Sequence, residues 1–298
     1  METNMRKQYI LTTDQLSDAD ERVITLLGEI GVFSFRNITQ KHKNQVQNLG
    51  IMEPASIGIA AGLAKEGFIP FFHTIAPFIV ERAYEQLKVD FGYQCLCGNF
   101  VSVGASYDDG GLGSTHYCPA DVPALMHIPN MQIVVPGTAK ETDQLICSSY
   151  DNGYPTYYRL STACNRESYY EGFGKAVVIK KGIKATVVAV GPLLEPVLEA
   201  VRDLDVTVLY YTTVTPFDKE CLCENCASRK VLLCEPYYYG ALTTEIMTAL
   251  QGAVMMDFVG VDHKFITTYG SKEQIDKDQG ISPCEIAAKL RVLLDRPL

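Results

Sequence analysis

The sequence lacks a surplus of basic residues and lacks any long apolar run. Its 26 lysine and arginine residues are outnumbered by 35 aspartate and glutamate residues, which gives a formal net charge of −9. No nucleic-acid partner is therefore expected, because no excess positive charge is present to neutralise phosphates. No apolar run reaches the ~18 residues that a membrane-spanning helix requires, so no membrane partner is expected either.

The N-terminal segment METNMRKQYILTTDQ lacks the apolar core and the cleavage site of a secretory signal. We therefore expect a cytoplasmic protein. Internal repeats and low-complexity tracts are also missing. The chain has 298 residues, of which 47% are hydrophobic and 20% are charged. This is the composition of a globular protein, and the length is enough for two domains of ordinary size.

Ten cysteines are present, but their spacing is irregular. In a reducing compartment such residues are expected as free thiols. Cys221, Cys223 and Cys226 form a C-x-C-x-x-C pattern, yet no histidine or cysteine pair nearby has the spacing of further zinc ligands. The favoured interpretation is a loop with free thiols.

Strand-like and helix-like segments alternate along the first part of the chain. Buried strands are predicted within 21–31, 68–76, 100–106, 131–137 and 155–161, and helices within 54–67, 77–94, 119–128 and 140–153. Strands that are separated by helices indicate a parallel sheet with both faces covered.

The alternation restarts after a glycine-punctuated connector at 163–182. Strands are predicted within 185–191, 206–211, 230–236 and 256–262, and helices within 194–204, 240–250 and 282–294. The sequence thus predicts two consecutive α/β domains, a parallel-sheet domain at 1–170 and a smaller α/β domain at 171–298.

Glu53 stands directly before an apolar segment that is rich in alanine, glycine and isoleucine. One interpretation is structural: a glutamate at a helix N-cap, with Pro54 at N1, is favoured by the helix dipole. The other is functional. Apolar surroundings raise the pKa of a carboxyl group and allow it to share a proton with a bound heteroatom.

Two further segments contain candidate functional residues. In GLGSTHY, the glycines permit tight turns, and His116 falls in a loop that follows a predicted strand. Ligands of open α/β sheets bind at the carboxyl ends of strands, which favours a functional histidine. Phe78 follows the strand that ends at Thr74, where an aromatic ring could stack on a planar ligand or simply pack in the core.

Five segments resemble, in order and spacing, the C-terminal half of transketolase. They are GIMEPASIGIAAGLAKEG, TIAPFIVERAYEQ, GLGSTHY, PALMHIPNMQIVVPG and PTYYRLS. The resemblance is strongest to the C-terminal subunit of split, two-gene transketolases and extends from about Glu21 to the end. It implies a pyrimidine-binding domain for thiamine diphosphate, followed by a transketolase C-terminal domain.

The resemblance also implies roles for individual residues. Glu53 matches the glutamate that hydrogen-bonds N1′ of the thiamine aminopyrimidine and favours the imino tautomer that removes the C2 proton. Phe78 matches the aromatic residue that stacks on the pyrimidine ring. His116 matches the active-site histidine that contacts substrate oxygen atoms and helps to move protons.

Other positions are implied more loosely. Ile75 lies where the family often has a second phenylalanine in the ring pocket, and Glu29 lies near an aspartate that lines the same ring. The remaining candidates for contact with the cofactor or the substrate are His73, Arg82 and Thr162.

The sequence departs from the family at the expected sugar-binding positions. Leu112 stands where members that handle phosphorylated sugars tend to carry an aspartate. Thr162 stands where they carry an arginine that grasps the sugar phosphate, and Arg159 and Arg166 are only nearby. Because a bidentate arginine is the usual partner of a phosphate, both the hydroxyl pattern and the phosphate of the substrate stay open.

The chain contains no GDG sequence, which in the family opens the motif that binds the diphosphate and Mg²⁺. Mg²⁺ prefers carboxylate and amide oxygen ligands, so we expect a partner subunit to hold it. Alone, the chain is expected to be inactive, and an α2β2 complex is the simplest symmetric assembly. Tyr237–Tyr239, where the family has a histidine, are interpreted as packing or interface residues.

Three functions follow from these features. The leading one is a thiamine diphosphate-dependent transketolase subunit that transfers a two-carbon ketol unit from a ketose to an aldehyde. The second is a decarboxylating carboligase, similar to deoxyxylulose-phosphate synthase or to the β subunit of 2-oxoacid dehydrogenases. The third is a non-catalytic partner subunit.

Overall fold

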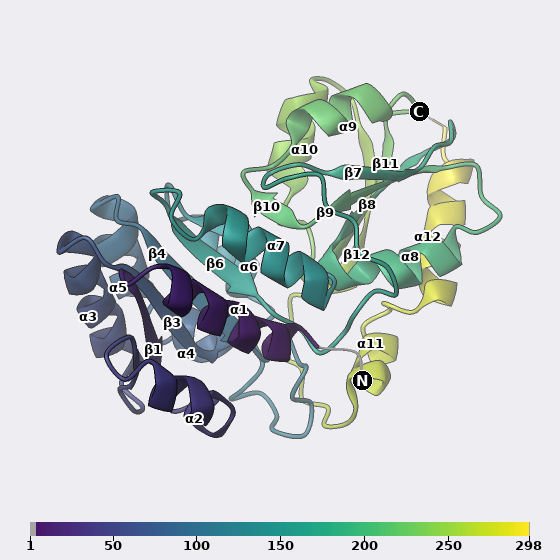
Figure 1. Cartoon of the computed structure of the whole chain (residues 1–298). Helices are drawn as coiled ribbons and strands as arrows, with labels where there is room; N and C mark the ends of the chain where they lie inside the picture. The colour runs from purple at the N-terminus through teal and green to yellow at the C-terminus, as the bar shows by residue number, and fades with distance from the viewer. Residues whose placement is uncertain (1–3, 298) are drawn as a thin grey trace.

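Two β-sheets organise the chain, and each is built mainly from one half of the sequence (Figure 1). The computed structural model describes residues 4–297. The first sheet has the order β10-β5-β6-β4-β3-β1-β2 and the second has the order β12-β11-β8-β9-β7. The predicted fold class, two consecutive and mostly parallel α/β units, is confirmed.

The first sheet contains six parallel strands from the N-terminal half. They are β1 Val23–Leu27, β2 Val46–Asn48, β3 Ile69–Ile75, β4 Gly98–Val103, β5 Gln132–Val134 and β6 Pro155–Arg159. Strands β1, β3 and β6 are buried along their whole length. This burial is what a near-continuous apolar run in a doubly covered sheet predicts.

Helices cover both faces of this sheet. One face packs against α1 Met5–Ala19, α2 Val32–Lys41 and α7 Ala139–Ser149, and the other packs against α3 Glu53–Lys65, α4 Ala76–Val80 and α6 Asp121–Leu125. Helix α1 was not predicted, because its buried face includes two threonines and a serine and therefore forms only a weak apolar stripe.

The single helix predicted at 77–94 is wrong. The segment divides into α4, the short α5 Tyr84–Gln86 and the π-helix η1 Leu87–Tyr93. The break lies at Ala83, whose φ of −121° is not helical. Apolar periodicity continues across the break because Ile79, Ala83 and Leu87 are all buried, so the pattern alone could not reveal it.

The second sheet contains β7 Val177–Lys180, β8 Thr186–Val190, β9 Thr207–Tyr211, β11 Lys230–Tyr238 and β12 Met255–Val261. Only β7 runs antiparallel to its neighbour. It lies inside the expected connector at 163–182, which is therefore not wholly irregular. The sheet is accompanied by η2 Gly191–Leu193, α8 Leu194–Ala200, α9 Lys219–Asn225, α10 Thr243–Leu250, α11 Lys272–Asp278 and α12 Pro283–Asp295.

The C-x-C-x-x-C segment is not a loop. Cys221 and Cys223 lie on α9, and Cys226 is the residue that caps its end. No disulfide joins any of the ten cysteines, all of which lie within the described residues. No helix within residues 4–297 combines the length and the apolar character needed to cross a bilayer.

One strand from the C-terminal half belongs to the first sheet. Strand β10 Thr213–Thr215 pairs antiparallel with β5. The two units are thus joined by a shared sheet edge as well as by the chain. The boundary predicted at residue 170 stays a prediction.

Candidate functional site

Glu53 is a carboxylate that is almost completely buried, with an exposed fraction of 1%. It begins helix α3, with Met52 as the N-cap, so the helix starts one residue earlier than the sequence predicted. Its position in the first turn is favourable because the positive end of the helix dipole attracts an anion. On the same helix, the small residues Ser56 and Ala60 are buried against the sheet.

Arg82 is the partner of this carboxylate. Its Nη1 lies 3.0 Å from Oε1 and 2.9 Å from Oε2 of Glu53. The Arg82 side chain is 44% exposed and the Glu53 side chain only 2%, so the ion pair connects a buried acid to the surface. The sequence predicted only apolar surroundings for Glu53, whereas the structure adds a cation from a segment 29 residues away.

Arg82 also lies on the ring of Phe78. Its guanidinium carbon is 4.1 Å from the centroid of that ring. The ring of His116 meets Phe78 edge-on, with centroids 5.5 Å apart and an interplanar angle of 69°. Four of the predicted residues, Glu53, Phe78, Arg82 and His116, therefore form one continuous cluster.

The loop that carries His116 is held in place from both sides. Within the loop, the Thr115 hydroxyl lies 3.0 Å from Nδ1 of His116. The Tyr117 hydroxyl donates to the carbonyl of Gly110 at 2.7 Å. From the second domain, Tyr269 packs so closely that a Cβ at Gly113, where φ is +77°, would lie 2.5 Å from its ring. Only glycine combines this backbone conformation with so close a contact.

Ile75 and Glu29 occupy the same edge of the sheet with other neighbours. Ile75 is buried at the end of β3 and packs against Gly104, where a Cβ would lie 2.8 Å from its Cγ2. Glu29 is exposed after β1, and its carboxylate accepts a hydrogen bond of 2.8 Å from the Asn48 amide. Their implied contact with a cofactor ring stays a prediction.

His73 lies on the opposite face of the sheet from helix α3. Its ring is fully buried, 5.0 Å from that of Tyr9 on α1 and 5.9 Å from that of Phe35 on α2. Nδ1 is 2.8 Å from the carbonyl oxygen of Val101. Burial lowers the pKa of His73 to about 4, so the ring is neutral near pH 7. The structure does not bring it into the Glu53 cluster.

Thr162 and Arg159 follow the last parallel strand and have different environments. Thr162 is exposed, and its backbone N–H donates to the Asp108 carboxylate at 2.8 Å. Arg159 is 1% exposed and pairs with Asp121 at 2.6 Å. Arg159 lies within the strand predicted at 155–161. Its charge is neutralised inside the protein by Asp121, so it is not available to a substrate phosphate.

Two cavities of about 400 Å³ lie away from the cluster. One, at the junction of the two domains, is lined by Asp108, Arg159, Ser161 and residues of the second domain. The other is lined by His127, Tyr238, Tyr239, His263 and neighbouring residues. Neither is lined by Glu53, Phe78 or His116.

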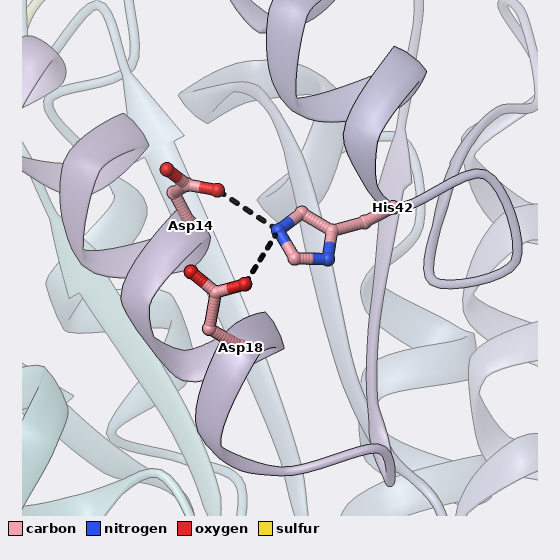
Figure 2. Close-up of side chains that lie close together, drawn as sticks. All are labelled: Asp14, Asp18 and His42. Atoms are coloured by element: carbon pink, nitrogen blue, oxygen red, sulfur yellow. Dashed lines mark hydrogen bonds and ion pairs between the residues drawn. The ribbon is translucent and has the colours of Figure 1, made fainter.

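A further group of polar side chains, Asp14, Asp18 and His42, has the spacing of metal ligands (Figure 2). Nε2 of His42 lies 2.8 Å from Asp14 and 3.6 Å from Asp18. The ammonium of Lys41 binds both carboxylates. Because a lysine already balances the negative charge, we interpret this group as an ion-pair network that fastens α1 to the end of α2.

Sequence reasoning missed one cation at the candidate site's edge of the sheet. Arg6, from the unpredicted helix α1, lies close to Gly31, where a Cβ would be 3.5 Å from its Nη2. Burial lowers the pKa of Arg6, and the charge of Asp109 partly opposes that effect. No motif marks this arginine, because its position depends on how α1 packs on the face of the sheet.

Two family models match the chain. The model described as "Transketolase, pyrimidine binding domain" matches residues 1–165, and the model described as "Transketolase, C-terminal domain" matches residues 174–286.

Several relatives are similar over most of the chain. An "Uncharacterized 33.6 kDa protein in fasciation locus" of Rhodococcoides fascians is 34% identical over 93% of this chain and 88% of its own length. A subunit of the apulose-4-phosphate transketolase of Actinobacillus succinogenes is 27% identical over 80% of this chain and 81% of its own length. "1-deoxy-D-xylulose-5-phosphate synthase" of Polaromonas is 28% identical over 84% of this chain but only 40% of its own length.

Two solved structures share the fold. One is described as "Split gene transketolase, inactive beta4 tetramer" and matches with a TM-score of 0.87 over 99% of both chains, at 24% identity. The transketolase of Campylobacter jejuni matches with a TM-score of 0.81 over 98% of this chain and 47% of that chain, at 17% identity. The chain therefore belongs to the transketolase family and comprises its pyrimidine-binding and C-terminal domains.

Proposed function

We propose that this chain is the pyrimidine-binding subunit of a thiamine diphosphate-dependent transketolase, which transfers a two-carbon ketol unit from a ketose donor to an aldehyde acceptor. The observation that carries the proposal is the buried carboxylate of Glu53, placed in one cluster with the ring of Phe78 and the imidazole of His116. A non-catalytic subunit would not need an ionisable acid beside an aromatic ring and a histidine, whereas proton exchange with a nitrogen-containing ring requires one.

The donor set fits an aminopyrimidine. Both oxygens of Glu53 already accept hydrogen bonds from a planar N–H donor that lies on the face of Phe78. Glu53 would hold the ring nitrogen, Phe78 would pack on the ring face, and His116 would exchange protons with substrate oxygens. When bound, thiamine diphosphate would supply the carbon nucleophile that protein side chains lack.

The diphosphate and Mg²⁺ would be held by a partner subunit. This chain has no GDG sequence. Large apolar side chains flank the cluster and are exposed: Ile51 by 72%, Met52 by 48% and Leu112 by 54%. Exposed apolar groups next to a polar site are typical of a surface that another protein covers. Two relatives are named as transketolase subunits, which supports the same kind of assembly, and α2β2 is its simplest form.

The donor sugar is proposed only by class. Leu112 is exposed four residues before His116 and offers no hydrogen bond to a hydroxyl group, and Arg159 is paired with Asp121. A ketose whose phosphate is recognised by other residues, or a ketose without phosphate, suits these features. Apulose 4-phosphate, which appears in the names of two relatives, is one donor to assay.

A decarboxylating carboligase is the second candidate. Relatives named as 1-deoxy-D-xylulose-5-phosphate synthases are 24–29% identical to this chain. The Glu53 cluster is compatible with either reaction, because both would use the same cofactor ring.

The experiment that tests the proposal uses this chain together with the product of a neighbouring gene that contains the GDG motif. Ketol transfer from several ketoses to aldehydes and CO2 release from pyruvate are measured in parallel, with wild type and Glu53→Gln. Ketol transfer that is lost in the variant supports the proposal. CO2 release without ketol transfer would favour the second candidate, and full activity of the variant would point to a non-catalytic subunit.

A further inference from the structure

Arg82 makes, within this chain, the two contacts that the proposed cofactor ring requires. Its Nη1 donates to both oxygens of Glu53 at 3.0 and 2.9 Å, and its guanidinium carbon lies 4.1 Å from the centroid of Phe78. A guanidinium is planar, delocalised and rich in N–H donors, and it stacks on aromatic faces. In shape and in hydrogen bonding it therefore resembles a protonated aminopyrimidine.

We propose that Arg82 is an internal competitor of the cofactor ring, which must leave Glu53 and Phe78 before the aminopyrimidine can bind there. The inference rests on the proposed function and goes beyond it, because it assigns to Arg82 control of cofactor affinity. Thiamine diphosphate binding then exchanges one planar donor for another on the same carboxylate, so Glu53 has a partner at every stage. An unpaired buried carboxylate would otherwise be costly.

The position of Arg82 suits this exchange. Its side chain is 44% exposed, whereas that of Glu53 is 2% exposed, so the arginine can swing into solvent while the acid stays in place. Arg82 lies at the break between α4 and α5, beside Ala83 with its non-helical φ of −121°. Solvent can replace the contacts of the half-exposed arginine, and a ligand that donates to Glu53 in its place offsets the loss of the ion pair.

The test measures thiamine diphosphate affinity of the reconstituted complex by calorimetry, for wild type, Arg82→Gln and Arg82→Lys. Removing the competitor should tighten binding by about tenfold or more in Arg82→Gln, because the cofactor ring no longer has to displace a half-exposed arginine from Glu53 and Phe78. Arg82→Lys keeps the charge but loses the planar fork, and its affinity should fall between the two. Arg22→Gln is the matched control, because Arg22 is similarly exposed at 49% and pairs with Asp20 and Asp151. It should leave the affinity unchanged.

Chemical rescue separates competition from a structural role. Millimolar guanidinium, added to Arg82→Gln, should occupy the vacated contacts and return the affinity toward the wild-type value, while it should not affect the wild type. Circular dichroism and thermal melting confirm that each variant is folded. If Arg82→Gln does not fold, Arg82→Lys and its response to guanidinium decide the question.

The possible failures can be told apart. If Glu53→Gln abolishes binding but Arg82→Gln weakens it or leaves it unchanged, Arg82 is not a competitor and the proposed cofactor site stands. If Glu53→Gln binds the cofactor as tightly as wild type, or if the wild-type complex does not bind it, the proposed function and this inference are both overturned.

Discussion

Arg159 and Asp121 form an ion pair of 2.6 Å whose two side chains are 1% and 0% exposed. The pair joins the end of β6 to helix α6, and Nη2 of Arg159 also donates to the carbonyl of Pro236 on β11. The Tyr157 hydroxyl donates to the same oxygen of Asp121 at 2.9 Å. A buried charge network thus connects the two domains.

Breaking this ion pair should destabilise the protein strongly. Arg159→Gln leaves the Asp121 carboxylate buried without its cation and should lower the free energy of unfolding by about 3–5 kcal/mol. Arg159→Gln/Asp121→Asn removes both charges and should cost less than the sum of the two single changes. Urea unfolding of the four proteins measures this coupling. Strict additivity would show that the pair contributes no interaction energy.

His73 should contribute stability that is lost in mild acid. Burial lowers its pKa to about 4 from the usual 6.5, so the unfolded chain binds more protons than the folded chain between these values. Stability from this residue is therefore complete above pH 6.5 and is lost as the pH falls toward 4, by about 3 kcal/mol. His73→Asn keeps a donor for the Val101 carbonyl and does not titrate. In urea unfolding, the stability of the variant relative to the wild type should therefore increase as the pH falls from 6.5 to 4.5; a difference that does not change with pH would contradict the assignment.

Glu235 should have the opposite pH dependence. It accepts backbone N–H bonds from Gly240, Ala241 and Leu242 at the start of α10, but burial outweighs them and raises its pKa to about 7 from 4.5. The folded state binds more protons between these values, so stability is greatest below pH 4.5. It falls as the pH rises toward 7, by about 3 kcal/mol.

Because His73 and Glu235 act in opposite directions over overlapping pH ranges, their two contributions to the free energy of unfolding should largely cancel between pH 4.5 and 6.5. Glu235→Gln should expose the His73 contribution as a clear rise of stability with pH in urea unfolding. A flat profile in this variant would show that Glu235 does not titrate in this range.

The parts of the fold that could be predicted are those where the pattern is local. The buried strands β3 and β8 are continuous apolar runs, and α12 has its cap at Ser282 followed by Pro283. The unpredicted parts depend on tertiary contacts. Strand β10 has three residues and exists because it pairs with β5, and helix α1 buries threonines and a serine.

The candidate site divides in the same way. Phe78 and His116 are predicted from segments that follow strands, and parallel strands bring such segments to one edge. Glu53 is predicted from the apolar helix that follows it. The ion pair between Arg82 and Glu53 was not predicted, because it depends on the break in the helix after α4. The apolar periodicity of the sequence continues across this break and therefore does not reveal it. His73 belongs to the same strand as Thr74, but strand alternation points it toward α1 and α2.

The most direct test of the account is the rate at which the C2 proton of thiamine diphosphate exchanges for deuterium in the reconstituted complex. The measurement is made by NMR after acid quench, with cofactor at saturation, for wild type and Glu53→Gln. Because Glu53 is the only carboxylate in the cluster that we assign to the ring nitrogen, the variant should exchange about 10²- to 10⁴-fold more slowly, the range typical of a lost acid–base contact. Equal exchange rates in the two proteins would contradict the central claim.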